Sequence, residues 1–95
     1  MHVVVSPEAE RLVRERGGRI YVWTDRQRCC GGATYLTTAT TPPRGRPFRK
    51  VDGPEDFDLF VDLGRRSAPD ELRLDARGWR RRRVEAYWNG CVFVI

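Results

Sequence analysis

Residues 56–63 alternate between acidic and apolar residues, with Phe60 as the one exception. Apolar side chains stand at every second position, and acidic residues hold three of the positions between them. The apolar set is Phe57, Leu59, Val61 and Leu63. Because successive side chains of a strand point to opposite faces, this pattern predicts a strand with one face in a core and the other in solvent. Such a strand needs partner strands and a covering layer from the rest of the chain.

Five other stretches have the composition of short strands and are separated by turn residues. They are residues 19–24, 33–41, 71–75, 80–88 and 91–95. Asn89-Gly90 joins the last two, and both residues accept the positive φ of a type I′ turn, so we expect a hairpin there. Residues 42–54 hold four prolines and two glycines. We expect a mobile basic loop without a strand in that range.

The N-terminal region has the signals of one helix. Ser6 is suited to the N-cap and Pro7 to the first helical position. The apolar stripe follows helical spacing and consists of Ala9, Leu12 and Val13. Gly17-Gly18 ends the helix. One helix and about six short strands predict a mainly β (α+β) fold, with residues 1–95 forming a single domain.

The three cysteines are the side chains of this sequence best suited to metal binding or covalent chemistry. Cys29 and Cys30 are adjacent in the connection between the two strands at 19–24 and 33–41, and Cys91 follows the predicted Asn-Gly turn. Arg26 and Arg28 would favour the thiolate, which is the form that binds metals. Buried cysteine is also a common small hydrophobe, so a structural role for these thiols stays open. The sole histidine, His2, is expected to be frayed at the N-terminus.

No apolar run approaches the ~20 residues that span a bilayer. We therefore expect no membrane association and a cytoplasmic location, where thiols stay reduced. The odd count of three cysteines also argues against a complete disulfide framework.

The chain carries a formal net charge of +5, and its eighteen basic residues are all arginines except Lys50. Arginine binds phosphates bidentately, so nucleic acid has to be weighed as a partner. The run Arg80–Arg83 is predicted on a strand, where successive side chains point to opposite faces and cannot form one flat patch unless the strand is an exposed edge ribbon. We therefore do not expect nucleic acid as a partner. The aspartates of residues 56–62 are expected to be solvated or paired with arginines rather than to bind a cation.

The order of motifs resembles the HesB/IscA-like family, the A-type iron–sulfur cluster carriers. The first motif is carried by Cys30, Gly32 and Tyr35, the middle stretch by Val61-Asp62 with Ser67, and the C-terminal thiol by Cys91. The family's C-terminal Cys-Gly-Cys is reduced here to Cys91 alone, and Cys29 is an additional thiol where the family usually has glycine. The chain therefore resembles an atypical member.

The resemblance implies a HesB-like small β-sandwich or barrel with one N-terminal helix. It also implies that Cys30 and Cys91, assisted by Cys29, bind an iron–sulfur cluster or iron. A [2Fe–2S] centre normally needs four protein ligands, so two protomers of a homodimer would share the site or a small thiol or partner residue would complete it. Iron–sulfur assembly or client proteins are the expected partners. By the same ligand count zinc is chemically compatible, although the spacing matches no standard zinc motif.

Two other functions remain open from the residues alone. In the first, Cys29-Cys30 carries a persulfide or cycles through a disulfide, with Cys91 as the resolving thiol, in a redox or sulfur-transfer protein. In the second, the chain is a basic nucleic-acid or protein interaction module in which the cysteines are incidental. Of these readings, a binding or carrier protein is favoured over an enzyme.

Overall fold

A computed structural model describes residues 1–26, 33–64, 66–91 and 94. The described residues form one helix and seven strands. In chain order these are β1 (His2–Val5), α1 (Pro7–Glu15), β2 (Arg19–Arg26), β3 (Thr34–Ala39), β4 (Arg49–Val51), β5 (Asp58–Asp62), β6 (Glu71–Arg77) and β7 (Arg83–Trp88). The mainly β fold expected from the sequence is confirmed.

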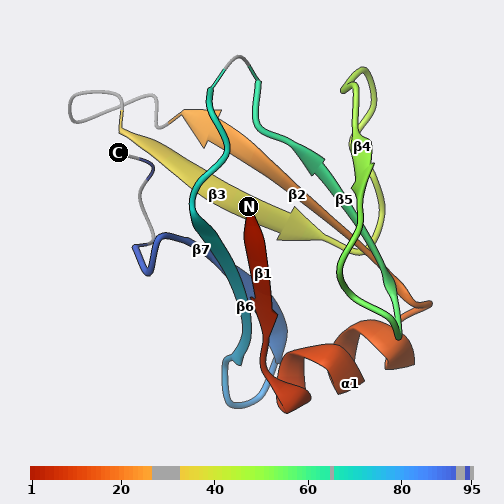
Figure 1. The fold of residues 1–95 in the computed structure, drawn as a ribbon. Helices are drawn as coiled ribbons and strands as arrows, with labels where there is room; N and C mark the ends of the chain where they lie inside the picture. Colours follow the sequence, from red (N-terminus) through yellow and green to blue (C-terminus); the bar gives the residue numbers. More distant parts are fainter. Residues whose placement is uncertain (27–32, 65, 92–93, 95) are drawn as a thin grey trace.

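The strands form two mixed sheets (Figure 1). The three-stranded sheet has the order β1-β6-β7, and the four-stranded sheet has the order β3-β2-β5-β4. Each sheet contains one parallel pair: β1 with β6, and β2 with β5. The remaining pairs are antiparallel. The edges of the two sheets meet where the Thr38 hydroxyl of β3 donates a hydrogen bond to the Val84 carbonyl of β7.

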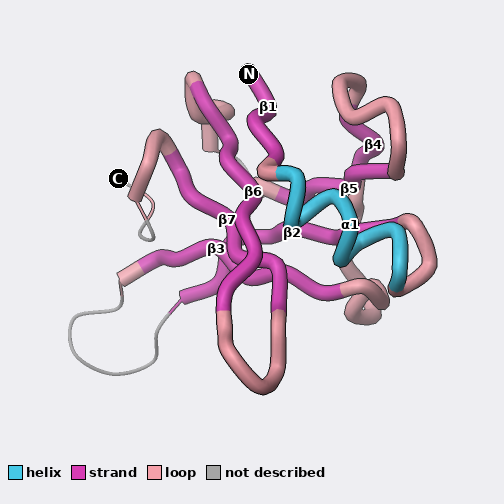
Figure 2. The backbone as a smooth tube through the Cα atoms, turned by 90° about the horizontal axis from the view of Figure 1, so that it is seen from below, coloured by secondary structure: helices cyan, strands magenta, loops and turns pink. Residues whose placement is uncertain are grey.

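One hydrophobic core joins both sheets to the helix. The fully buried side chains at its centre come from α1, β2, β5 and β6, and they are Val13, Ile20, Val22, Leu59, Leu72 and Leu74. Figures 1 and 2 show α1 lying across one end of the two sheets. The helix buries Ala9, Leu12 and Val13, which is the stripe predicted from the sequence. The one helix of the described residues, α1, is not long and apolar enough to cross a bilayer.

The helix begins as its sequence predicts. The Ser6 hydroxyl accepts a hydrogen bond from the Ala9 amide, and Pro7 occupies the first turn.

The four predicted apolar residues of the alternating segment 56–63 are all buried, and β5 forms its centre. The side chains of Asp58 and Asp62, on the other face of β5, form ion pairs with Lys50 and Arg46, respectively.

The outer face of the four-stranded sheet carries a second, aromatic cluster. The Tyr21 ring stacks on Phe60, with centroids 5.1 Å apart, and meets the edge of Phe48 at 5.2 Å. The Arg46 guanidinium lies 5.8 Å from the centroid of the Trp23 ring and forms an ion pair of 3.4 Å with Asp62. Since Arg46 and Phe48 belong to residues 42–54, this segment folds back over the sheet and is anchored to it. The segment is therefore not the excursion away from the sheet that the sequence had suggested.

Three further sequence expectations need correction. Residues 42–54 do contain a strand, because β4 pairs with β5 over three residues between Pro47 and Gly53. His2 is not frayed, because β1 runs parallel to β6 and pairs His2 with Glu71. The last long strand begins at Arg83 rather than at residue 80.

The Asn-Gly hairpin turn is present as predicted. Asn89 and Gly90 both have positive φ, 48° and 82°. Trp88 and Cys91 close the turn with two backbone hydrogen bonds, 2.7 Å and 2.9 Å long. Beyond Cys91, the predicted returning strand falls on residues of which only Val94 is described, and Val94 is not in a strand.

Replacing Gly90 with valine should destabilise the protein, because a β-branched residue resists positive φ. No atom lies within 4 Å of a Cβ added at this glycine, so the loss would come from the backbone conformation and not from a clash. We expect Gly90→Val to lower the free energy of unfolding by about 1–2 kcal/mol in urea titrations. Gly90→Asn is the matched control and should lose less, since asparagine tolerates this conformation. Equal stability of the valine variant and the parent would contradict the assignment of the turn.

Candidate functional site

The structure places Cys91 in the open. Its thiol is free, and its side chain is exposed directly after the Asn89-Gly90 turn. The backbone hydrogen bonds to Trp88 fix the position of Cys91 at the end of β7. The thiol is therefore held on an ordered turn and is accessible to a metal ion or a partner protein.

Cys29, Cys30 and Gly32 lie outside the described residues. The two strands that flank them are well defined, because β2 and β3 pair antiparallel and their last pair joins Arg26 to Thr34. The prediction that this stretch connects two paired strands is therefore confirmed. Both ends of the cysteine connection are held side by side at the end of the four-stranded sheet.

Three chain segments converge on Thr34, the first residue of β3. The Val94 amide donates a hydrogen bond of 2.9 Å to the Thr34 carbonyl. The Arg66 guanidinium donates one of 3.1 Å to the Thr34 hydroxyl. We call Thr34, Arg66 and Val94 the Thr34 junction. It brings the segment that follows Cys91 and the loop after β5 to the end of the cysteine connection.

Most of the remaining residues of the family-like motifs pack in the fold or form hydrogen bonds within it. Tyr35 is half-buried on β3 opposite Asp25, and Val61 is buried in the core. One Asp62 oxygen accepts a hydrogen bond from the Gly64 amide, while the other faces Arg46. Ser67 is exposed in the loop next to Arg66. Of this set, Ser67 is the exposed residue, and Tyr35 directly follows Thr34 of the junction.

Within the described ranges, no three histidine, cysteine or acidic side chains stand close enough together to hold a metal ion. Any thiolate site with several protein ligands must therefore involve Cys29 or Cys30, or a second protomer. Sequence reasoning identified the cysteines but missed Arg66 and Thr34. These two residues have no local sequence pattern that would mark them.

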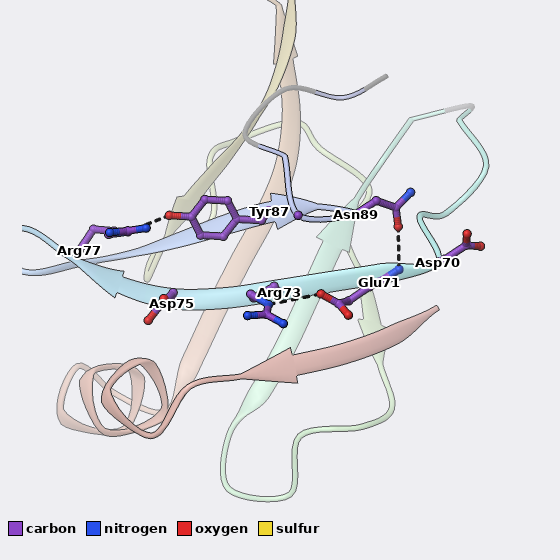
Figure 3. Close-up of a pocket in the computed structure, with 8 residues that line it drawn as sticks. Asp70, Glu71, Arg73, Asp75, Arg77, Tyr87 and Asn89 are labelled. Carbon is purple, nitrogen blue, oxygen red and sulfur yellow. Dashed lines mark hydrogen bonds and ion pairs between the residues drawn. The ribbon is translucent and has the colours of Figure 1, made fainter.

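A groove on the described surface lies elsewhere, over the outer face of β6 and β7 (Figure 3). It has a volume of about 580 Å³ and is lined by Asp70, Glu71, Arg73, Asp75, Arg77, Tyr87, Asn89 and Gly90. Both of its arginines have partners within the groove: Arg73 pairs with Glu71 at 3.3 Å, and Arg77 donates to the Tyr87 hydroxyl at 2.9 Å. It holds no cysteine. We therefore do not place the functional site there.

One carboxylate of the groove connects the sheet to the helix. A hydrogen bond from the Ser6 hydroxyl holds the pKa of Asp75 below its ordinary value, and the Ala76 amide acts in the same direction. Because the Ser6 oxygen also accepts from Ala9, it couples the first turn of α1 to β6. The pairing stabilises the folded state only while Asp75 is ionised.

No known protein-family model matches the chain. No curated protein matches its sequence. Among solved structures, the chain is similar to the crystal structure of SufA from Escherichia coli, a protein involved in the biosynthesis of iron–sulfur clusters. The match has a TM-score of 0.54 and 17% sequence identity, and it covers 93% of this chain and 81% of SufA. At this identity the likeness establishes the fold, and it confirms the small β-rich HesB-like architecture expected from the sequence.

The Ser6–Asp75 contact predicts how stability responds to acid. Asp75 has a lowered pKa in the folded state, so its contribution is present above the ordinary value of 3.8 and is lost as the pH falls below it. Ser6→Ala removes the largest cause of the shift, and we expect this variant to lose less stability than the parent on acidification from pH 5 to about pH 3. At neutral pH the same variant should be less stable by about 1 kcal/mol, because it lacks the N-cap.

The control for this experiment is the Asp75→Asn background, in which the carboxylate cannot titrate. There, Ser6→Ala should change the stability at neutral pH without changing its dependence on pH. Urea unfolding across the pH range measures both effects. If Ser6→Ala alters the acid response equally with and without Asp75, the contact does not have this role.

Proposed function

We propose that the protein is a carrier of an iron–sulfur cluster or iron, held by the thiolates of Cys30 and Cys91 with assistance from Cys29. The observation that carries the proposal is the Thr34 junction. There the chain three residues after Cys91 is hydrogen-bonded to the chain four residues after Cys30. Two sequence-distant thiol segments are thereby tied to the same end of one sheet.

The likeness to SufA and the sequence resemblance to the HesB/IscA-like carriers support the same process. The proposal places this chain as an atypical member of that family, because it has Cys91 alone at its C-terminal end and an additional thiol at Cys29. Its partners would be the proteins that assemble clusters and those that receive them. The exposure of Cys91 supports direct transfer between proteins, since a client's thiolate can approach its sulfur.

The donor set suits iron in charge and type. Thiolates are the ordinary protein ligands of iron–sulfur clusters, and a [2Fe–2S] cluster takes four of them. One protomer supplies three cysteines, so a cluster would be shared between two protomers or completed by an external thiol. A cluster with four thiolate ligands is anionic, and the guanidinium of Arg66 at the junction would offset part of this charge. Binding and release of such cargo requires no catalytic residue, so we propose a carrier and not an enzyme.

Loading measurements on cysteine variants test the proposal. Protein purified without oxygen and supplied with ferrous iron and sulfide should contain iron and acid-labile sulfide. Cys30→Ala and Cys91→Ala should each lose nearly all of this cargo, whereas Cys29→Ala should retain a substantial part. The reason is that Cys30 and Cys91 hold the family-like positions, whereas adjacent side chains of an extended segment point apart.

As a control, circular dichroism and melting temperature should show that the three variants are folded as well as the parent. Iron and sulfide loading that is the same in all three variants and the parent would refute the carrier function. Loading with zinc alone would also refute it. A persulfide that forms on Cys29 or Cys30 without iron would instead identify the sulfur-transfer alternative.

The distance between the two principal thiols gives an independent test. In the Cys29→Ser variant, mild oxidation should join Cys30 to Cys91 within one chain, because a disulfide forms only when the two Cα atoms come within about 7 Å. Mass spectrometry of the monomer after proteolysis would identify the linked peptides. The Cys30→Ser variant, which retains Cys29 and Cys91, is the control and should form this link more slowly. Exclusive formation of links between chains would assign the thiol pair to a shared dimer site.

A further inference from the structure

The hairpin between β6 and β7 ends in a run of arginines. β6 ends at Arg77 and β7 begins at Arg83, and the intervening residues form bends outside any strand. We call residues 77–83 the arginine tip; they are Arg77, Gly78, Trp79, Arg80, Arg81, Arg82 and Arg83. The expectation that strand geometry sends successive arginines to opposite faces therefore fails for Arg80–Arg82. All seven residues of the tip are exposed.

A single aromatic side chain stands among these arginines. Trp79 is 90% exposed, whereas Trp23 and Trp88 are 9% and 6% exposed. The Arg80 guanidinium lies 5.7 Å from the centroid of the Trp79 ring and covers part of it. A single exposed hydrophobic side chain is common, but an indole placed among arginines leaves its ring available for stacking on a planar group.

The backbone of the tip is fixed in shape. Gly78 has a φ of +96°, and a Cβ at this position would lie 2.3 Å from the Arg81 carbonyl oxygen. The Arg16 guanidinium, just after α1, donates a hydrogen bond to the Arg82 carbonyl oxygen. The turn is thus closed tightly on itself and tied to the helix end, so the side chains of Trp79 and Arg80–Arg82 are presented from a defined scaffold.

Arg80–Arg83 form no ion pair with an acid among the described residues, although Arg82 lines a groove that also holds Glu8 and Glu15. The ion pairs found among the described residues involve Arg14, Arg46, Lys50 and Arg73. In that part of the chain, none involves Arg80, Arg81, Arg82 or Arg83, and residues 77–83 contain no acidic residue. Arginines without acidic partners keep all their guanidinium donors available for phosphate oxygens.

We propose that the arginine tip binds single-stranded nucleic acid, with Trp79 stacking on a base and Arg81 and Arg82 contacting the flanking phosphates. An exposed aromatic ring among arginines matches the chemistry of single strands, whose unpaired bases offer free faces and whose backbone offers closely spaced anions. A duplex keeps its bases stacked on one another, so it would use the arginines but not the indole. This binding function is separate from the proposed cargo function.

A membrane surface fits these observations less well. In the described part of the chain, Met1 and Trp79 are the only exposed large hydrophobic side chains, so the tip offers one apolar group to a bilayer. Anchoring on lipid requires a larger buried apolar area. The tip also lies at the opposite end of β7 from Cys91. The six residues of that strand separate the two by about 17–20 Å, so nucleic acid could bind without covering the thiol.

Fluorescence measurements can test the proposal directly, because Trp79 is the only exposed tryptophan of the three. Binding of the parent protein to a short fluorescein-labelled thymidine homopolymer would be followed by anisotropy. The emission of Trp79 would be followed in a parallel titration with the unlabelled oligonucleotide, and stacking should quench it. Trp79→Ala should raise the Kd by about fivefold or more, whereas Trp79→Phe, which keeps an aromatic face, should raise it less.

The arginines are tested through the dependence on salt. The double variant Arg81→Ser/Arg82→Ser should reduce the slope of log K against log salt by about 1.4, since each lost phosphate contact on a single strand contributes about 0.7. The control variant Arg44→Ser/Arg49→Ser removes the same charge from exposed positions outside the tip and should leave the slope nearly unchanged. All four arginines are exposed, so these variants should keep the fold.

Three results would overturn the proposal. One is equal affinity of the parent and Arg81→Ser/Arg82→Ser for the oligonucleotide, and another is binding without quenching of Trp79. The third is binding to vesicles of anionic phospholipid without binding to the oligonucleotide, which would assign the tip to a membrane surface. Because no cysteine takes part, a variant lacking all three thiols should bind the oligonucleotide like the parent, whatever the outcome of the iron measurements.

Discussion

The fold depends on the burial of β2 on both of its faces. On one face Ile20 and Val22 enter the core, and on the other Tyr21 and Trp23 are covered by the segment around Arg46 and Phe48. A shift of one residue in register would exchange the aliphatic and aromatic sets between two differently shaped environments. The register of β2 with β3 and β5 is therefore strongly specified. This register also fixes Arg26 opposite Thr34 at the base of the cysteine connection.

Local sequence patterns were sufficient to predict the elements that are determined by neighbouring residues. The N-cap at Ser6, the alternation of residues 56–63 and the turn at Asn89-Gly90 each depend on neighbouring residues, and each is confirmed. β1 and β4 were not predicted, because each is stabilised by pairing with a strand that is distant or separate in the sequence. β1 exists through its parallel pairing with β6, and β4 is a three-residue edge strand that depends on β5. The prolines and glycines around β4 obscured any strand pattern.

The same distinction between local and long-range determinants applies to the candidate site. Sequence placed Cys91 after a turn and Cys29-Cys30 in a connection between paired strands, because both placements follow from local turn and strand signals. The Thr34 junction could not be found this way, since its hydrogen bonds join residues 32 and 60 positions apart. The arginine run was misassigned because a strand pattern alone does not show where a hairpin turn begins. The positive φ of Gly78 opens that turn before the arginines and leaves Trp79 outside the sheet.

The parallel pairing of β1 with β6 also sets the order of events during synthesis. His2 pairs with Glu71, and at ordinary ribosomal rates the intervening chain takes roughly 3 to 14 s to synthesise. Until then Val3, Val4 and Val5 have no strand beside them, and the core side of α1 lacks the layer formed by β6 and β7. The cysteine pair is thus translated and left outside a completed fold for seconds before Cys91 exists. During that interval the apolar surface of the nascent chain is incomplete, and incomplete apolar surface of this kind is what makes folding intermediates prone to aggregate.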